Sequence, residues 1–395
     1  MERKNGRLVA LVSSVAVAAV VTGGVLAYRQ APNDGGGSSA APLPGQPTPK
    51  ASVKTPSRTP VLTPSATPSS TPTLTSPSTP PVTAHPVEIE VDLAGLATGP
   101  GTDVTHLAGR EVRGGGPTVK IPGSQRIVEF ARLGNGVVAM VRTDGGGDEL
   151  LVTGTGQPTR RIPHVSTLAA DETGTAAAYS TTVVNPDGVV TRGGSVHYLS
   201  AGGTAKTLAL PGDTFALRVV AVLDGKVYYK STDEHADVER LYEWSPATTT
   251  PKLVKAITAT AVLSRDGRYA TSHRNGPSSV CHAVRVVATG KKLWETCKAD
   301  LLDFTPDSGV TIGRGYAGGT AMIRITAQDT KTGKLLHAWT GFFENVVAED
   351  NQHVLISTAG ATGAAFIRCA VSTGACEYAV PPGDAELRLD SRMTI

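Results

Sequence analysis

The chain has 395 residues, with 44 glycines, 27 prolines, four cysteines and a formal net charge of +3. This length allows one large domain or two ordinary ones, and so small a charge gives no reason to expect a nucleic-acid partner. The sequence contains no Gly-x-Ser-x-Gly, His-Glu-x-x-His or Walker motif, and it therefore indicates no catalytic residue, metal ligand or cofactor.

Residues 1–30 are predicted to be a membrane segment. Arg3, Lys4 and Arg7 precede an uncharged run from Leu8 to Ala27. A helix of this length extends about 30 Å, which matches the hydrocarbon core of a bilayer, and its positive flank stays inside the cell. The run predicts a single-pass membrane anchor that leaves the rest of the chain outside the cytoplasm. The alternative is a signal peptide cleaved after Ala27, which would release a secreted protein.

Residues 31–86 are predicted to be a disordered linker rich in Pro, Thr and Ser. Thr-Pro occurs seven times between Thr48 and Pro80, and no acidic residue lies between Asp34 and Glu88. Such a segment cannot bury enough apolar surface to offset its chain entropy. We interpret it as a stalk, and O-glycosylation of this stalk is a further possibility.

Residues 87–395 are predicted to be the folded domain, because one unit recurs there. The unit is an apolar strand, a turn built on Asp or Asn, and a second apolar strand, as in "RVVAVLDGKVYYKS". Asn and Asp favour such tight turns because they tolerate a positive φ. The turn residues, spaced 36 to 53 residues apart, are Asn135, Asp171, Asp224, Asp266, Asp307, Asp350 and Asp390.

A second hairpin follows most copies of this unit, so that each repeat holds four short strands. Alternation with a period of two dominates, and no segment shows a helical stripe. Four strands in each 40–45 residues are typical of a β-propeller blade. Seven blades fit residues 87–395 best, at about 44 residues per blade. The prediction is therefore an all-β, seven-bladed propeller.

Two of the turns carry a family resemblance. "SRDGRYA" at Ser264–Ala270 and "FTPDSG" at Phe304–Gly309 resemble the Ser-Pro-Asp-Gly turn of the extracytoplasmic WD-like and TolB-like β-propellers of high-GC Gram-positive bacteria. The resemblance implies the propeller fold and a place outside the cytoplasm. It implies no active site, because such propellers serve scaffolding, ligand binding and catalysis alike.

The two ends of the folded region are predicted to close the ring together. The last copy, "AELRLDSRMTI" at residues 385–395, has the first two strands of a blade and lacks the outer two. Residues 104–123 look like an outer hairpin without its inner strands. We expect the two hairpins to share one blade, because pairing them hides strand edges that would otherwise be exposed.

The four cysteines are predicted to form two disulfides. Cys281 and Cys297 flank one outer hairpin turn, and Cys369 and Cys376 flank another. Residues that face each other across an antiparallel hairpin lie within disulfide range. A metal site is the alternative, but the sequence has no Cys-x-x-Cys motif and only His282 is near.

Several other features have both a structural and a functional interpretation. Residues 305–312 nearly match the Asp-box turn of sialidases, which we interpret as an ordinary turn. The loop tips at residues 142–149 and 183–195 are the places where a specific contact would be expected. We interpret the single histidines and the aromatic pairs as packing residues: His106, His197, His337, Tyr228 with Tyr229, Tyr242 with Trp244, and Phe342 with Phe343.

The leading functional interpretation is a non-catalytic binding or scaffold module at the cell surface, with a protein, peptide or cell-wall glycan as its ligand. The alternative is a glycan-acting hydrolase or lyase with a site over the central channel. A third possibility is a membrane-side partner of an export or signalling system. Acidic and arginine side chains clustered at the channel mouth would favour the enzyme, and a weakly polar channel would favour binding. The sequence does not assign the binding residues.

Overall fold

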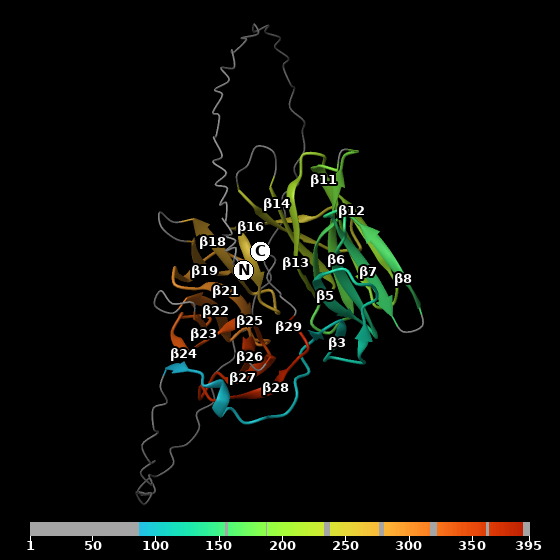
Figure 1. Cartoon of the computed structure of the whole chain (residues 1–395). Coiled ribbons are helices and arrows are strands. Elements are labelled where there is room, and N and C mark those ends of the chain that lie inside the picture. The colour runs from blue at the N-terminus through green and yellow to red at the C-terminus, as the bar shows by residue number, and fades with distance from the viewer. Residues whose placement is uncertain are drawn as a thin grey trace, which may run out of the picture. The chain divides into compact units, whose positions relative to one another are not determined.

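The computed structural model describes residues 87–154, 157–186, 188–232, 238–275, 280–316, 322–360 and 363–389, which all belong to one compact unit (Figure 1). The predicted membrane segment at residues 1–30 and the predicted linker at residues 31–86 lie outside these ranges. A search of the described part of the chain finds no helix that is both long enough and apolar enough to cross a bilayer.

The described residues form a seven-bladed β-propeller, as predicted. Blade 1 consists of β5 (Ile127–Leu133), β6 (Gly136–Arg142), β7 (Asp148–Gly154) and β8 (Gln157–Pro163). Blade 2 consists of β9 (Val165–Ala170), β10 (Ala176–Val184), β11 (Val190–Ser200) and β12 (Ala205–Ala209). Blade 3 consists of β13 (Phe215–Leu223), β14 (Lys226–Thr232), β15 (Arg240–Trp244) and β16 (Lys252–Thr258).

The remaining blades follow the same order. Blade 4 consists of β17 (Thr260–Leu263), β18 (Tyr269–Asn275), β19 (Val280–Val286) and β20 (Lys292–Thr296). Blade 5 consists of β21 (Asp300–Phe304), β22 (Val310–Tyr316), β23 (Ile323–Asp329) and β24 (Leu335–Gly341). Blade 6 consists of β25 (Phe343–Ala348), β26 (His353–Gly360), β27 (Gly363–Ala370) and β28 (Cys376–Gly383). In each blade the first strand lies innermost, and successive inner strands contact one another around the ring.

The predicted Asp and Asn turns join the first and second strands of blades 1 to 6. The turn of blade 4 shows why these residues occur there. Asp266 accepts hydrogen bonds from the Ser264 hydroxyl at 2.7 Å and from the Arg268 amide at 2.9 Å. Gly267 follows with φ +67°, a left-handed conformation that costs glycine little. All six turns therefore lie at the same end of the ring.

Blade 7 closes the ring, but its division between the two chain ends differs from the prediction. The C-terminal end supplies only the innermost strand, β29 (Leu387–Leu389). The N-terminal part supplies three strands, which are β2 (His106–Ala108), β3 (Glu111–Arg113) and β4 (Val119–Lys120). Our prediction of two strands from each end was therefore wrong. The tight turn after Ala108 lets residues 104–123 form three very short strands. The first of them, β2, therefore pairs directly with β29. The rest of the predicted C-terminal hairpin, from Asp390 on, lies outside the described residues.

A further feature, which we did not predict, is the segment that we call the N-terminal strap (residues 87–105). Its strand β1 (Glu88–Glu90) pairs in parallel with β24 at the outer edge of blade 5. A short 3₁₀ helix, η1 (Leu93–Gly95), follows, and Thr98 then pairs with Tyr378 on β28 of blade 6. In Figure 1 the strap is the blue to cyan segment that begins beside β24 and passes the red blade. The strap therefore covers the exposed edges of two blades before the chain enters blade 7.

Apolar side chains fill the spaces between blades, and buried polar side chains join the inner strands. Glu129 of blade 1 accepts a hydrogen bond from the Leu168 amide of blade 2 at 2.9 Å. Thr167 of blade 2 accepts one from the Val219 amide of blade 3 at 2.8 Å, and Asp303 of blade 5 accepts one from the Ala348 amide of blade 6 at 2.9 Å. Because the acceptors are fixed by their own blades, these bonds set how neighbouring blades align.

The structure contains two disulfides, Cys281–Cys297 and Cys369–Cys376, at the pairs that the hairpin register predicted. In both, the Cα atoms are 4.1 Å apart. Cys369 and Cys376 are direct partners across β27 and β28. Each disulfide therefore ties the outermost strand of its blade to the strand inside it.

Candidate functional site

A cavity of about 960 Å³ that could hold a ligand lies at the end of the central channel. The inner strands of blades 1 to 6 reach this end at their first turns, and all six blades contribute to its wall. The last part of the N-terminal strap, from Pro100 to Thr105, completes the rim. We call this cavity the channel mouth.

Carboxylates predominate in the channel mouth. Its wall holds three guanidinium groups and eight carboxylates, so that acidic groups exceed basic ones by five. The arginines are Arg132, Arg265 and Arg368, and the acidic residues are Asp103, Asp171, Glu172, Asp224, Asp303, Glu349, Asp350 and Glu377. Like charges gathered around a partly enclosed space reinforce one another, so that the site attracts cations.

Arg368 on β27 fastens one side of the rim. Its guanidinium donates to both carboxylate oxygens of Glu349, at 2.5 and 2.6 Å, and to Glu377 at 3.1 Å. It also donates to the carbonyl oxygens of Pro100 at 2.9 Å and Gly101 at 3.0 Å on the strap. Glu349 is the main cause of the raised pKa of this guanidinium. Arg368 thus joins the strap to blade 6 and is not available to a ligand.

The other two arginines are also held by the protein. Arg265 pairs with Glu172 across the ring and donates to the Ala348 carbonyl at 3.3 Å. Arg132 is almost fully buried and donates to carbonyl oxygens of blade 7, including those of Gly114 at 2.9 Å and Val112 at 3.2 Å. Burial lowers the pKa of the Arg132 guanidinium. All three guanidinium groups therefore stabilise the wall of the channel mouth.

Two carboxylates of the rim remain accessible. Asp103 on the strap and Asp224 in the first turn of blade 3 are exposed, and neither side chain bonds to any residue in the described part of the chain. Asp350, by contrast, lies 2.9 Å from the His353 ring. Burial alone would raise the pKa of Asp350, but hydrogen bonds from His353 and from the Gln352 amide outweigh burial and lower this pKa. Asp103 and Asp224 are therefore the anionic groups best placed to meet a cation.

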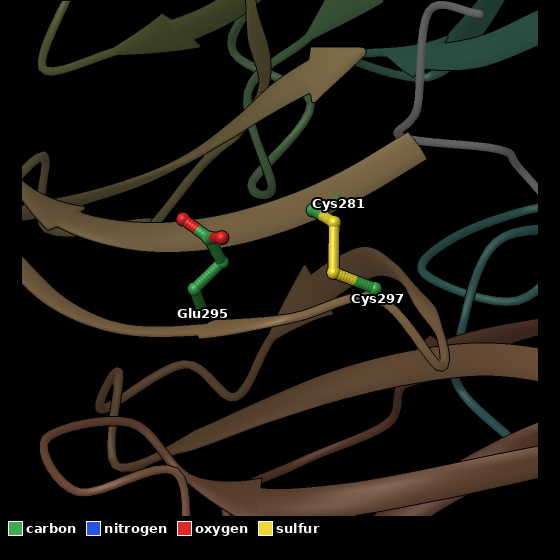
Figure 2. A group of neighbouring side chains, drawn as sticks. All are labelled: Cys281, Glu295 and Cys297. Carbon is green, nitrogen blue, oxygen red and sulfur yellow. A yellow bond between two sulfur atoms is a disulfide. The ribbon is translucent and has the colours of Figure 1, made fainter. Parts of the chain in front are cut away.

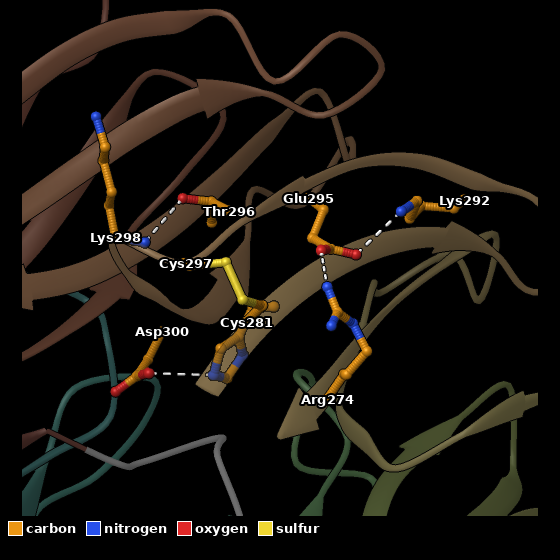
Figure 3. Close-up of a disulfide and its surroundings, with 9 residues drawn as sticks. Arg274, Cys281, Lys292, Glu295, Thr296, Cys297, Lys298 and Asp300 are labelled. Atoms are coloured by element: carbon orange, nitrogen blue, oxygen red, sulfur yellow. Dashed lines mark hydrogen bonds and ion pairs between the residues drawn. A yellow bond between two sulfur atoms is a disulfide. The ribbon is translucent and has the colours of Figure 1, made fainter. Parts of the chain in front are cut away.

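The described residues bring one possible set of metal-ligating side chains together, at Cys281, Glu295 and Cys297 (Figure 2). Both sulfur atoms belong to the disulfide, and so neither is a free thiolate. Glu295 is engaged by Arg274 at 2.5 Å and by Lys292 at 3.0 Å (Figure 3). Zinc needs thiolate rather than disulfide sulfur. While Cys281 and Cys297 form a disulfide, these three side chains therefore do not fit a metal ion.

The other features that the sequence singled out do not line the channel mouth. Tyr229, Trp244 and Phe343 are buried and pack between strands, as interpreted, whereas Phe342 is 64% exposed. Residues 305–312 form an ordinary turn in which the Thr305 hydroxyl bonds to Asp307. His106 and His337 are buried. The loop tips at residues 142–149 and 183–195 lie at the opposite end of the blades from the first turns.

Sequence reasoning placed no residue at the channel mouth. The Asp turns were a usable signal, because equivalent turns of a closed ring must gather at one end. Arg368 had no such signal, since its strap partners are 267 and 268 residues away in the sequence.

Comparisons with known proteins find similarity to solved structures alone. Neither a protein-family model nor a curated protein matches the chain. Among solved structures, the chain is similar to prolyl oligopeptidase B from Galerina marginata (11% identity, TM-score 0.48), with 67% of this chain and 43% of that chain covered. It is also similar to the β-propeller domain of the Trilobed protease from Pyrococcus furiosus (8%, TM-score 0.46, 66% and 84% covered). TolB from Acinetobacter baumannii is a third (15%, TM-score 0.41, 68% and 67% covered). The chain thus spans less than half the length of the prolyl oligopeptidase.

Proposed function

We propose that this propeller is a non-catalytic binding module whose channel mouth receives a positively charged segment of a peptide or protein. The observation that carries the proposal is the excess of carboxylates around a cavity large enough for several side chains. Charge complementarity of this kind supplies specificity and speeds association. A propeller offers a rigid wall for such contacts, because each blade is fixed by both of its neighbours.

The arrangement of charges bears on the choice between binding and catalysis. Acidic and arginine side chains do cluster at the channel mouth, which is the pattern that we associated with the enzyme from the sequence. However, glycan hydrolysis needs one carboxylic acid to donate a proton and a second carboxylate to act as base or nucleophile. Glu349 and Glu377 are both engaged by Arg368, at 2.5 and 3.1 Å, and so neither is free to act on a ligand. The clustered charges thus stabilise the wall, and this supports binding over catalysis.

A peptide-binding experiment tests this proposal. Fluorescence anisotropy would compare the binding of a lysine-rich peptide and of a length-matched glutamate-rich peptide to the full-length protein at several salt concentrations. We expect only the basic peptide to bind, with an affinity that falls as salt rises. Asp103→Asn and Asp224→Asn should each weaken binding by up to roughly fivefold at low salt, since an exposed ion pair contributes up to about 1 kcal/mol.

Asp144→Asn is the matched control, because Asp144 is an exposed carboxylate in a loop at the other end of blade 1. Its removal should leave the affinity unchanged. Equal binding of the acidic peptide, or equal effects of all three substitutions, would contradict the proposal. Cleavage of a cell-wall glycan by the protein, lost in the Asp224→Asn variant, would instead support the enzyme.

We also propose that residues 8–27 anchor the protein in the cell membrane with the propeller on the outer side. The uncharged run and its basic flank support this. Mild protease treatment of wall-stripped cells should cut within residues 31–86 and release a β-rich fragment. A protein recovered from the medium with Tyr28 as its first residue would show instead that the segment is a cleaved signal peptide.

A further inference from the structure

A second group of ionisable side chains lies at the other end of the ring, where blades 3, 4 and 5 meet. We call it the inter-blade histidine cluster, and it consists of Lys230, Glu239, His273, His282 and Asp300. Two of its members come from blade 3, two from blade 4 and one from blade 5. None of these residues lines the channel mouth.

Lys230 on β14 joins blade 3 to blade 4. Its ammonium group donates to the carbonyl oxygen of Thr260, the first residue of β17, at 3.0 Å. Its partner within blade 3 is Glu239, at 3.2 Å. The Lys230 side chain is only 6% exposed. A buried charge of this kind depends on its partners, because water cannot replace them.

The two histidines face each other beside this contact. His273 on β18 and His282 on β19 are direct cross-strand partners, and their ring centres are 6.2 Å apart. His282 Nε2 lies 3.1 Å from the Asp300 carboxylate of blade 5. His282 Nδ1 is buried and has no hydrogen-bond partner among the described residues.

Burial and a nearby positive charge disfavour the protonated form of His273. Burial is the main cause of the lowered pKa of His273, and the positive charge of Lys230 lowers it further. Glu239 acts in the opposite direction. Around the cluster, Arg218 on β13 adds positive charge near Lys230, and Arg314 on β22 adds it near Asp300. With His273 neutral, the three cations and two anions named here nearly balance, and protonating the His273 ring leaves two positive charges in excess.

We propose that His273, which faces His282, forms an acid-sensitive latch that loosens the junction of blades 3 and 4 when the His273 ring carries a proton. The direction of this pH effect follows from the linkage between proton binding and opening of the junction. Opening the junction returns His273 to water, where its pKa is about 6.5. The open form then binds protons more readily than the closed form, so that opening becomes more favourable as the pH falls below about 6.5.

Hydrogen exchange measured by mass spectrometry on the full-length chain tests the latch. Peptides covering β14 and β17 would be compared at pH 7.5 and 5.5, after correction for the intrinsic exchange rate. We expect exchange in both strands to be several-fold faster at pH 5.5. The double variant His273→Gln with His282→Gln should lose this acceleration, because glutamine keeps a hydrogen-bonding group and cannot be protonated in this range.

His197→Gln is the control, because His197 is a half-buried histidine of blade 2 with a lowered pKa. It should keep the acceleration in β14 and β17. If the double variant fails to fold, Lys230→Met provides a second test. It removes the neighbouring charge, and His273 should then titrate at a higher pH in an NMR titration of its ring proton. Acceleration that persists without the two histidines, equal exchange at both pH values in the wild type, or an unchanged His273 titration would overturn the proposal.

Discussion

Arg368 is the residue on which the rim of the channel mouth most depends. One guanidinium binds two carboxylates on blade 6 and two carbonyl oxygens on the strap. Only arginine offers enough donors in a fixed plane for such an arrangement. The side chains of Arg368 and Glu349 are 11% and 9% exposed, so that neither charge could be compensated by water if its partner were removed.

We expect Arg368→Gln to destabilise the protein by about 3–5 kcal/mol, because it leaves the buried Glu349 carboxylate unpaired. Arg113→Gln is the control: it breaks the exposed pair with Glu111 and should change the free energy of unfolding by less than about 1 kcal/mol. Urea denaturation of both variants measures the difference. Similar losses in the free energy of unfolding of the two variants would show that Arg368 does not stabilise the rim of the channel mouth.

Among the described elements, the closing blade has the shortest strands of the ring. Its four strands have only two or three residues each. Its stability comes from outside the blade, since Leu387 and Leu389 are buried against residues of blade 6 such as Leu355 and Phe366. Arg388 donates to the carbonyl oxygens of Ile127 and Val128 on blade 1. β29 therefore joins the first blade to the sixth.

Deletion of residues 387–395 should abolish the cooperative thermal melt or cause aggregation, because it exposes the inner edge of β2 and uncovers blades 1 and 6. Leu389→Ala is the milder test and should cost about 2–5 kcal/mol, as is usual for a buried leucine. A truncated protein that melts at the same temperature as the intact chain would refute this role for β29.

The two disulfides should stabilise their blades to similar extents. The cysteines of each pair are 16 and 7 residues apart, so that loop-closure entropy accounts for about 3 and about 2.5 kcal/mol respectively. We expect Cys281→Ser with Cys297→Ser to lower the free energy of unfolding by roughly the larger amount. Peptide mapping without reduction checks the pairing, and crosswise peptides would contradict the register of both hairpins.

For the molecule as a whole, buried histidines should make stability depend on pH. Burial is the main cause of the lowered pKa values of His106, His197 and His273. The unfolded chain binds protons more readily at these positions than the folded one. The contribution of these neutral histidines to the free energy of unfolding is therefore fully present above a pH of about 6.5. It is lost progressively as the pH falls below this value.

We expect the free energy of unfolding to fall steadily between pH 7.5 and 5, as measured by urea denaturation at a series of pH values. A triple variant with glutamine at residues 106, 197 and 273 should show a flatter profile in this window. A wild-type profile that is level, or that rises on acidification, would disprove the assignment. Below about pH 4 a further loss should appear in both proteins, because Asp266 and Asp300 have lowered pKa values in the fold.

The propeller, its blade number and the disulfide pairs could be predicted from the sequence, because these depend on local order. Strand alternation and an Asp or Asn turn such as Asp266 specify a hairpin within a few residues. The register of that hairpin then places Cys369 opposite Cys376. The closure of the ring, the path of the strap and the charges that meet at the channel mouth could not be predicted in this way. Those depend on which strand edges remain free once seven blades have packed, and on contacts such as Arg368 to Pro100, which join residues far apart in the chain.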